Sequence, residues 1–315
     1  MSERFLKYSI YLKQKYGQKV YKLPVNLDLT CPNRDDNLSE GGCSFCSEIG
    51  TGFENVDNSL SVKNQLLENK EVIGKKYNAD KFIAYFQNFT NTYMPIDKFK
   101  KVIKESSIKD ILKTSISTRP DCISDKYLKV LKDIAKNNNI NISIELGLQS
   151  MKYTTLEKVN RGHSLAEFID AVLRIKRFNF NITVHLIANL PWDSKDDLVE
   201  TAKVMSALDI DQIKLHSLYI LKGTKLGKEY KNNEFEICSM KDYIERIVEF
   251  IRYTKEDIVF QRFLARAPKD KALFCNWGRS WWKINNLILK KLDEENIFQG
   301  DKCNYLNGKA LNKFD

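Results

Sequence analysis

The chain has 315 residues, 43% of them hydrophobic, which is enough to bury the core of one large barrel or of two ordinary domains. The formal net charge of +10 suits a polyanionic partner such as RNA, although a generally lysine-rich, solvated surface explains the same charge equally well. No window reaches the roughly 18 uninterrupted apolar residues of a membrane span, and the N-terminus carries no signal-peptide run, so the composition excludes a membrane protein and predicts a cytoplasmic one.

Runs of β-branched and aromatic residues predict six strands, and amphipathic patterns between them predict helices. The predicted strands are 20–29, 81–87, 110–118, 141–149, 181–190 and 212–221, and the clearest helices are 59–77, 96–105, 124–136, 164–178 and 194–208. This alternation requires parallel crossover units, so we expect an α/β fold with a partial (β/α)6 TIM-like barrel. Functional groups then belong at the carboxyl ends of the strands.

After residue 222 the alternation stops. A helix at 240–254, a strand at 258–265 and a helix at 280–292 predict a small C-terminal α/β extension packed on the barrel. We therefore expect a barrel domain at 1–222 and an extension at 223–315, the latter being a candidate for substrate binding.

Three of the seven cysteines, Cys31, Cys43 and Cys46, lie on one segment that follows the first predicted strand. Three thiolates can hold three irons of a [4Fe–4S] cube and leave the fourth iron open to a chelating small molecule. A zinc site is the alternative, because Cys-x-x-Cys pairs are common in zinc proteins; its fourth ligand would have to be recruited by folding, for example Cys122. The remaining cysteines are scattered singly, which does not indicate a disulfide framework.

Seven segments of the chain resemble the Elp3-like radical S-adenosylmethionine (SAM) family, and specifically its short YhcC/YtqA branch. These segments are 31–35, 41–47, 85–93, 117–121, 145–150, 160–163 and 221–226. The resemblance implies a radical SAM barrel that uses a [4Fe–4S] cluster and S-adenosyl-L-methionine. It also implies that Cys31, Cys43 and Cys46 are the metal ligands.

The resemblance implies cofactor-binding residues at four strand ends. Gln87 and Asn88 would meet the methionyl part of SAM, and Arg119 would pair with its carboxylate. Glu145 and Gln149 would bind ribose hydroxyls or substrate, with an interior ion pair as the alternative for Glu145.

The fifth strand departs from the family pattern, since relatives tend to carry a glycine-containing turn where this chain has Asn189 in the sequence Ala-Asn-Leu-Pro-Trp-Asp. Asn tolerates unusual backbone dihedrals, so Asn189 remains a candidate for the adenine turn. His185 and His216 are expected to be hydrogen-bonded interior residues, and no catalytic residue is assigned.

The resemblance implies radical chemistry on tRNA, with a flavodoxin or ferredoxin as electron donor. Full-length Elp3 proteins carry an acetyltransferase domain after the barrel, for which this sequence leaves no room. For the short branch we expect conversion of carboxymethylaminomethyl to aminomethyl on the C5 side chain of wobble uridine. The alternatives are a radical SAM enzyme with a small-molecule or protein substrate and a non-catalytic, metal-bound RNA-binding module.

A C-terminal segment interleaves basic and aromatic residues, a composition suited to phosphate contact and base stacking. Its members are Arg262, Arg266, Lys269, Arg279, Trp281, Trp282 and Lys283. The alternative is an amphipathic helix whose Trp side chains are buried against the barrel.

Overall fold

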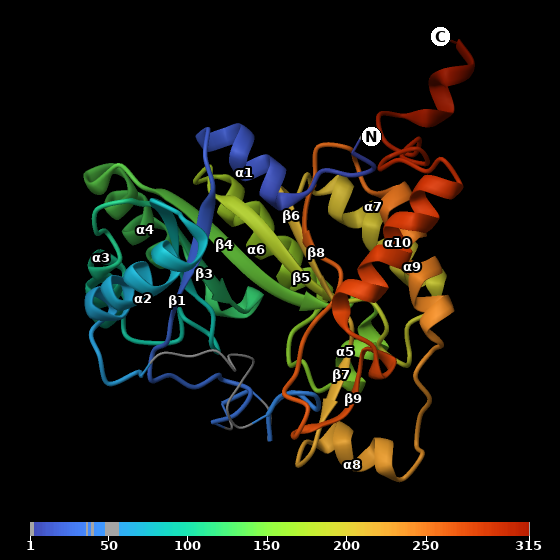
Figure 1. Cartoon of the computed structure of the whole chain (residues 1–315), viewed down its shortest axis with the longest axis horizontal. Helices are drawn as coiled ribbons and strands as arrows, with labels where there is room; N and C mark the ends of the chain where they lie inside the picture. Colours follow the sequence, from blue (N-terminus) through green and yellow to red (C-terminus); the bar gives the residue numbers. More distant parts are fainter. Residues whose placement is uncertain (1–2, 36, 39–40, 48–56, 315) are drawn as a thin grey trace. The chain divides into compact units, whose positions relative to one another are not determined.

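The computed structural model describes residues 3–35, 37, 38, 41–47 and 57–314 (Figure 1). The chain divides into two compact units. We call the one made of Ser9–Leu148 and Leu156–Val184 the cysteine unit, because it holds Cys31, Cys43 and Cys46. We call the other, made of Met1–Tyr8, Gln149–Thr155 and His185–Asp315, the C-terminal unit.

The main sheet has seven strands, in the order β1-β2-β3-β4-β5-β6-β8. Their bounds are β1 Val20–Val25, β2 Lys81–Phe86, β3 Ile111–Thr118, β4 Asn141–Gln149, β5 Asn181–Ile187, β6 Gln212–His216 and β8 Val259–Arg262. Strand β8 comes from the predicted extension and pairs in parallel with β6, so the sheet has one strand more than the six that the sequence predicted. The predicted boundary after residue 222 stays a prediction.

In the cysteine unit, strands β1 to β4 pair in parallel, with Val20 opposite Lys81 at one end and Ser117 opposite Glu145 further along the sheet. Residues on β4 alternate between two environments. Ile142, Ile144, Leu146 and Leu148 are at most 4% exposed and form part of the apolar core, whereas the intervening residues include the polar Ser143 and Glu145. The sheet therefore has one apolar face and one face that carries polar groups.

Among the residues that the structure describes, six α-helices lie wholly or partly in the cysteine unit: α1 Tyr8–Tyr16, α2 Val62–Tyr77, α3 Ile96–Glu105, α4 Asp125–Asn138, α5 Tyr153–Lys158 and α6 Leu165–Lys176. Ser61 caps α2 by accepting a hydrogen bond from Asn64 N, and Ser164 and Glu167 form a capping box on α6. In Figure 1, α2, α3 and α4 lie together beside β1 and β3. The sequence missed α1 and α5, which are short.

In the C-terminal unit, the predicted strand 212–221 is two strands. After β6 the chain leaves the main sheet, because Leu218 N donates to Asn189 Oδ1 and Ser217 Oγ donates to Asn276 Oδ1. It then forms β7 (Tyr219–Leu221), which pairs antiparallel with β9 (Ala272–Cys275). Side-chain bonds to distant residues thus end a run that local composition predicts to be continuous.

The helices of the C-terminal unit are α7 Lys195–Ala207, α8 Lys225–Lys231, α9 Met240–Tyr253 and α10 Trp281–Glu294. Helix α9 contacts both α7 and α10, and α8 contacts β7 (Figure 1). No helix within the described residues is both long and apolar enough to cross a membrane.

Candidate cofactor site

Cys31, Cys43 and Cys46 lie on the loop that follows β1 in the cysteine unit, and none of them forms a disulfide. Cys43 is buried and the other two are half-buried. The loop is turned by backbone bonds, from Arg34 N to Cys31 O at 2.7 Å and from Cys46 N to Cys43 O at 2.9 Å. The Arg34 guanidinium also donates to Ser47 O at 2.6 Å, which ties the two ends of the loop together.

The three sulfurs influence one another electrostatically. Burial, and then the neighbouring Cys43, raise the pKa of the Cys46 thiol to about 11. Within the described residues no group of three His, Cys, Asp or Glu side chains gathers around one point where a single metal ion would sit. The thiolates of a zinc site all bind one ion at about 2.3 Å and must converge on it. Each cysteine of a [4Fe–4S] cube binds a separate iron, so its thiolates need not converge on one point.

A second segment, residues 159–163, closes over the cysteine loop. Ser44 N donates to Val159 O at 3.0 Å, and Asn160 Nδ2 donates to Gly42 O at 2.9 Å. We call residues 159–163 the clamp segment, because it fixes the backbone of the loop on both sides of Cys43.

Two left-handed residues give the clamp segment its shape. Asn160 has φ 51° and Gly162 has φ 69°, and Arg161 N donates to Leu156 O at 2.8 Å where α5 ends. Residues 160–163 are one of the segments that resemble the family, but the sequence assigned them no role. The signal that points to their turn is Asn-x-Gly directly after a short helical pattern.

Arg119 follows β3 and is held by Asp121 in a bidentate pair, with Nε 2.9 Å from Oδ1 and Nη2 2.7 Å from Oδ2. Burial acts to lower the pKa of the Arg119 guanidinium, but the Asp121 carboxylate outweighs it and the pKa is raised. Arg119 is 2% exposed, and its Nη1 is buried with no hydrogen-bond partner among the described residues. One nitrogen of this guanidinium therefore remains for a ligand.

His163 lies near the guanidinium groups of Arg161 and Arg119 and is 6% exposed. Burial, then Arg161 and Arg119, lower the pKa of its imidazole, so the ring is neutral at physiological pH. Its Nε2 is 3.1 Å from Gly147 O on β4, which fixes the ring orientation. His163 thus adds no positive charge beside the cysteine loop.

Gln87 and Asn88 follow the end of β2, at the position that the sequence predicted. Asn88 is 3% exposed and donates from Nδ2 to Asn26 Oδ1 at 2.9 Å. Its Oδ1 is buried and has no hydrogen-bond partner in the described part of the chain. Asn91 holds the loop against β3 by donating from Nδ2 to Ser117 O at 3.0 Å.

Glu145 lies on the polar face of β4. Its carboxylate accepts hydrogen bonds from Lys22 Nζ at 2.8 Å, Ser115 Oγ at 2.8 Å and Tyr85 OH at 3.1 Å. This is the ion-paired arrangement that the sequence left open as the alternative to a ligand contact.

The remaining two predicted cofactor residues belong to the C-terminal unit. Gln149, at the end of β4, has a left-handed backbone with φ 77°. Asn189 is 1% exposed and accepts from Leu218 N at 2.7 Å, while its Nδ2 is buried without a partner among the described residues. Asn189 therefore organises the turn after β5 and keeps one free donor.

His185 and His216 stack with ring centroids 5.3 Å apart, and Nε2 of His216 is 3.3 Å from Nδ1 of His185. Arg262 Nη2 lies 2.8 Å from His216 Nδ1. Both histidines are hydrogen-bonded, as expected, but they are half-buried and not fully interior as the sequence predicted.

Helix α10 does not bury its tryptophans. Trp281 is 40% and Trp282 is 50% exposed, and the buried face of the helix consists of Ile284, Ile288 and Leu292. The Arg266 guanidinium lies 4.4 Å from the centroid of the Trp281 ring. The alternative of a helix with buried Trp side chains is therefore wrong.

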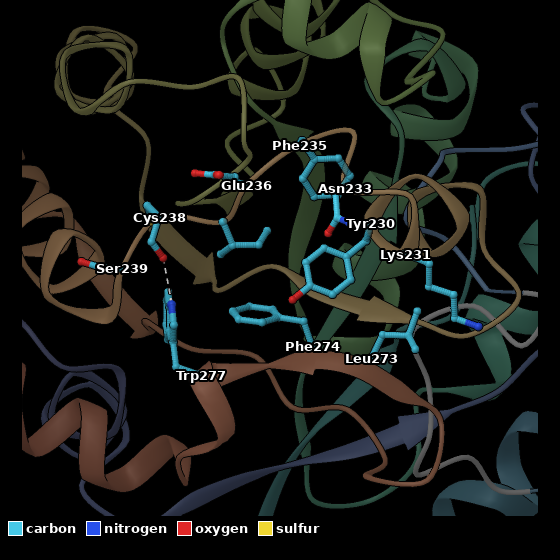
Figure 2. A pocket seen from close by; sticks show the side chains of 11 residues that line it. Tyr230, Lys231, Asn233, Phe235, Glu236, Cys238, Ser239, Leu273, Phe274 and Trp277 are labelled. Carbon is cyan, nitrogen blue, oxygen red and sulfur yellow. Dashed lines mark hydrogen bonds between the residues drawn. The ribbon is translucent and has the colours of Figure 1, made fainter.

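The C-terminal unit also contains an aromatic pocket of ≈ 610 Å³, which the sequence did not predict (Figure 2). Figure 2 shows the rings of Tyr230, Phe235, Phe274 and Trp277 lining it. Trp277 Nε1 donates to Cys238 O at 2.8 Å, so its ring is held in place. Flat rings around an open space are a stacking surface for a planar group.

Residues 31–205 match the Radical SAM superfamily and residues 210–294 match the Radical_SAM C-terminal domain. The uncharacterized protein YtqA from Bacillus subtilis is 30% identical over 302 residues, which are 95% of this chain and 92% of YtqA. Protein YhcC from Escherichia coli is 29% identical over 86% of each chain. The chain therefore belongs to the radical SAM superfamily, and it is similar over nearly its whole length to the short Elp3-like members.

Part of the chain resembles a named tRNA enzyme. The tRNA uridine(34) acetyltransferase from Methanocaldococcus infernus is 28% identical over 44% of this chain and 25% of its own. The solved structure of Elp3 from the same archaeon has a TM-score of 0.65 and 19% identity, covering 89% of this chain and 64% of that chain. The fold is thus the radical SAM partial barrel, as predicted.

Membership in this superfamily makes the protein an enzyme that uses a [4Fe–4S] cluster and SAM. It excludes the non-catalytic RNA-binding module that the sequence had left open.

Proposed function

We propose that the enzyme modifies tRNA and converts the carboxymethylaminomethyl side chain at C5 of wobble uridine to aminomethyl. The observation that carries the tRNA assignment is the exposed pair of Arg266 and Trp281, a cation and an indole ring presented together on the surface. Such a pair suits phosphate contact and base stacking at once. The partial similarity to a tRNA uridine(34) acetyltransferase supports the same substrate.

In this proposal Cys31, Cys43 and Cys46 hold the cluster. The residues present fit it: three free thiols lie on one tied loop, and two side-chain N–H groups donate to Cys43 Sγ at 3.5 Å. When bound, the cluster supplies the electron that cleaves SAM to the 5′-deoxyadenosyl radical. A flavodoxin or ferredoxin is the proposed electron donor.

SAM is proposed to meet Gln87, Asn88 and Arg119 in the cysteine unit. Arg119 Nη1 and Asn88 Oδ1 are buried polar atoms without partners in the described residues. The carboxylate of a ligand such as SAM can accept a hydrogen bond from Arg119 Nη1, and its amino group can donate one to Asn88 Oδ1. The roles of Gln149 and Asn189, which belong to the C-terminal unit, stay predictions from the sequence. Glu145 is better assigned to ordering the interior, because three donors already occupy its carboxylate.

The aromatic pocket of the C-terminal unit is proposed to receive an unpaired base of the bound tRNA. The ring of Tyr230 is 5.9 Å from that of Phe235 and 6.3 Å from that of Phe274, so the pocket offers several stacking surfaces. Lys231 lines the same pocket and suits a phosphate.

The test is the nucleoside profile of tRNA from a strain that lacks the gene. We expect carboxymethylaminomethyl uridine to accumulate at the wobble position and the aminomethyl form, with any product methylated from it, to disappear. Complementation with the parent gene restores the profile, whereas the Cys43→Ala gene does not. An unchanged profile would reject the tRNA substrate and favour a small molecule or protein as the substrate of the same radical chemistry.

A further inference from the structure

Cys43 is singled out among the three cysteines of the loop. Arg161 Nη1 and Asn33 Nδ2 each donate to its sulfur at 3.5 Å. Within the described residues no side-chain N–H donates to Cys31 or Cys46. A neutral thiol is a weak acceptor, so two converging donors suit a sulfur that carries negative charge.

Both donors are buried with the sulfur. Cys43 is 8% exposed, Arg161 6% and Asn33 0%. A full positive charge therefore lies beside one sulfur in surroundings from which water is largely excluded. Electrostatic interactions are stronger there than at the surface, because the local dielectric is low.

Neither donor is free to move. Arg161 Nη2 donates to Gly147 O on β4 at 2.7 Å, so the guanidinium bridges the sheet and the sulfur. Asn33 Nδ2 also donates to Asn160 O. Gly162 closes the arrangement, since a Cβ at this position would lie 2.3 Å from Asn33 Oδ1. The clamp segment thus fixes both N–H groups on the sulfur.

The consequence for a bound cluster is electrostatic. A reduced cluster carries one more negative charge than an oxidised one, so a fixed cation and two hydrogen bonds at one ligand stabilise the reduced form more. Removing them makes reduction harder and the potential more negative. A role limited to folding would change how much cluster assembles without changing the potential of the cluster that does assemble.

We infer that Arg161 and Asn33 are positioning residues that set the reduction potential of the cluster through the Cys43 sulfur. This inference rests on the proposed ligand role of Cys43. The left-handed turn of the clamp segment then has two roles. It holds the cysteine loop, and it positions the Arg161 guanidinium beside the Cys43 sulfur.

The experiment compares midpoint potentials of the anaerobically reconstituted protein, measured by redox titration followed by electron paramagnetic resonance, without SAM or substrate. We expect Arg161→Gln to shift the potential to a more negative value, Arg161→Lys to return it most of the way, and Asn33→Leu to shift it less than Arg161→Gln. Arg177→Gln is the matched control, because this 63%-exposed arginine pairs with Asp125 and its loss removes one charge elsewhere in the same unit.

Three results would overturn the inference: a potential for Arg161→Gln equal to that of the parent, an equal shift in the Arg177→Gln control, or a Lys variant no closer to the parent than the Gln variant. If Arg161→Gln does not fold, the potential of Asn33→Leu decides: a value equal to that of the parent protein would overturn the inference. The iron and sulfide content of Cys43→Ala tests the ligand role of Cys43 separately from the tuning of the potential by Arg161 and Asn33. A normal four-iron cluster in that variant would reject the ligand role itself.

Discussion

Asn33 and Gly162 approach each other so closely that a methyl group on residue 162 would lie 2.3 Å from the Asn33 side-chain oxygen. This contact joins the cysteine loop to the clamp segment. It also requires a residue without a side chain, because the backbone of Gly162 is left-handed with φ 69°.

We predict that Gly162→Ala lowers the cluster content of the reconstituted protein substantially. Gly41→Ala is the matched control, because Gly41 lies on the cysteine loop itself, also has a left-handed backbone (φ 75°), and has no described atom within 4 Å of an added Cβ. Both variants bear the left-handed backbone cost of about 1–2 kcal/mol, and only Gly162→Ala must also displace Asn33. Iron content and thermal unfolding measure the difference, and equal behaviour of the two variants would contradict the close approach.

Alanine substitution of Cys31, Cys43 or Cys46 is predicted to abolish the four-iron cluster, because each thiolate binds a separate iron. Cys275→Ala is the control, since Cys275 is also half-buried but lies on β9. Iron and sulfide analysis with the absorption near 400 nm reads the outcome. Full cluster content in any of the three variants would remove that cysteine from the ligand set.

Arg119→Ala is predicted to destabilise the protein by about 3–5 kcal/mol, because it leaves the Asp121 carboxylate, whose side chain is only 9% exposed, without its ion-pair partner. Arg119→Ala combined with Asp121→Ala should recover a large part of this loss. Denaturant unfolding of both variants gives the free energies. SAM binding by the folded double variant then tests the ligand role separately, and normal affinity would argue against a contact between Arg119 and SAM.

Asp110 gives a pH-dependent prediction. Side-chain bonds from Lys70 and then Lys81 lower the pKa of its carboxyl to about 2. A carboxyl with a lowered pKa stabilises the fold above its unfolded pKa of 3.8, and this stabilisation is lost as the pH falls toward 2. Asp110→Asn should therefore cost about 0.2–1 kcal/mol at pH 7 and almost nothing near pH 2.

Asn suits the test because Asp110 has φ 74°, a conformation that Asn also tolerates. The substitution thus removes the charge without adding backbone strain. Unfolding free energies across the pH range measure the effect, and a difference that stays constant down to pH 2 would contradict the ion-pair origin.

The proposed tRNA-binding surface of the C-terminal unit, which includes Arg266 and Arg279, is tested by a double variant, Arg266→Gln with Arg279→Gln. Arg262 is left in place, because it lies against His216. Each lost phosphate contact in a single-stranded region should reduce the slope of log affinity against log salt by about 0.7. The control is Lys129→Gln with Lys136→Gln, two exposed positions on α4. An unchanged slope with normal tRNA affinity would reject this surface.

The sequence by itself determined the alternation of strands and helices, because β-branched runs and capped amphipathic helices are local signals. Strand β4 was predicted with its observed bounds, Asn141–Gln149. The spacing of Cys31, Cys43 and Cys46 likewise indicated an iron–sulfur site, because all three thiols follow one strand within a short stretch of chain. Local pattern also placed Gln87 and Arg119 at strand ends, which is where they lie.

Tertiary structure decided what depends on residues far apart in the chain. Arg161 lies 118 positions from Cys43, so no spacing rule brings its guanidinium to that sulfur. Strand β8 joins the main sheet through β6, although its sequence reads as part of a separate extension. Asn189 ends β6 by accepting from Leu218, 29 residues away. Hydrogen bonds and ion pairs of this kind form only after folding brings their partners together, so local sequence periodicity does not predict them.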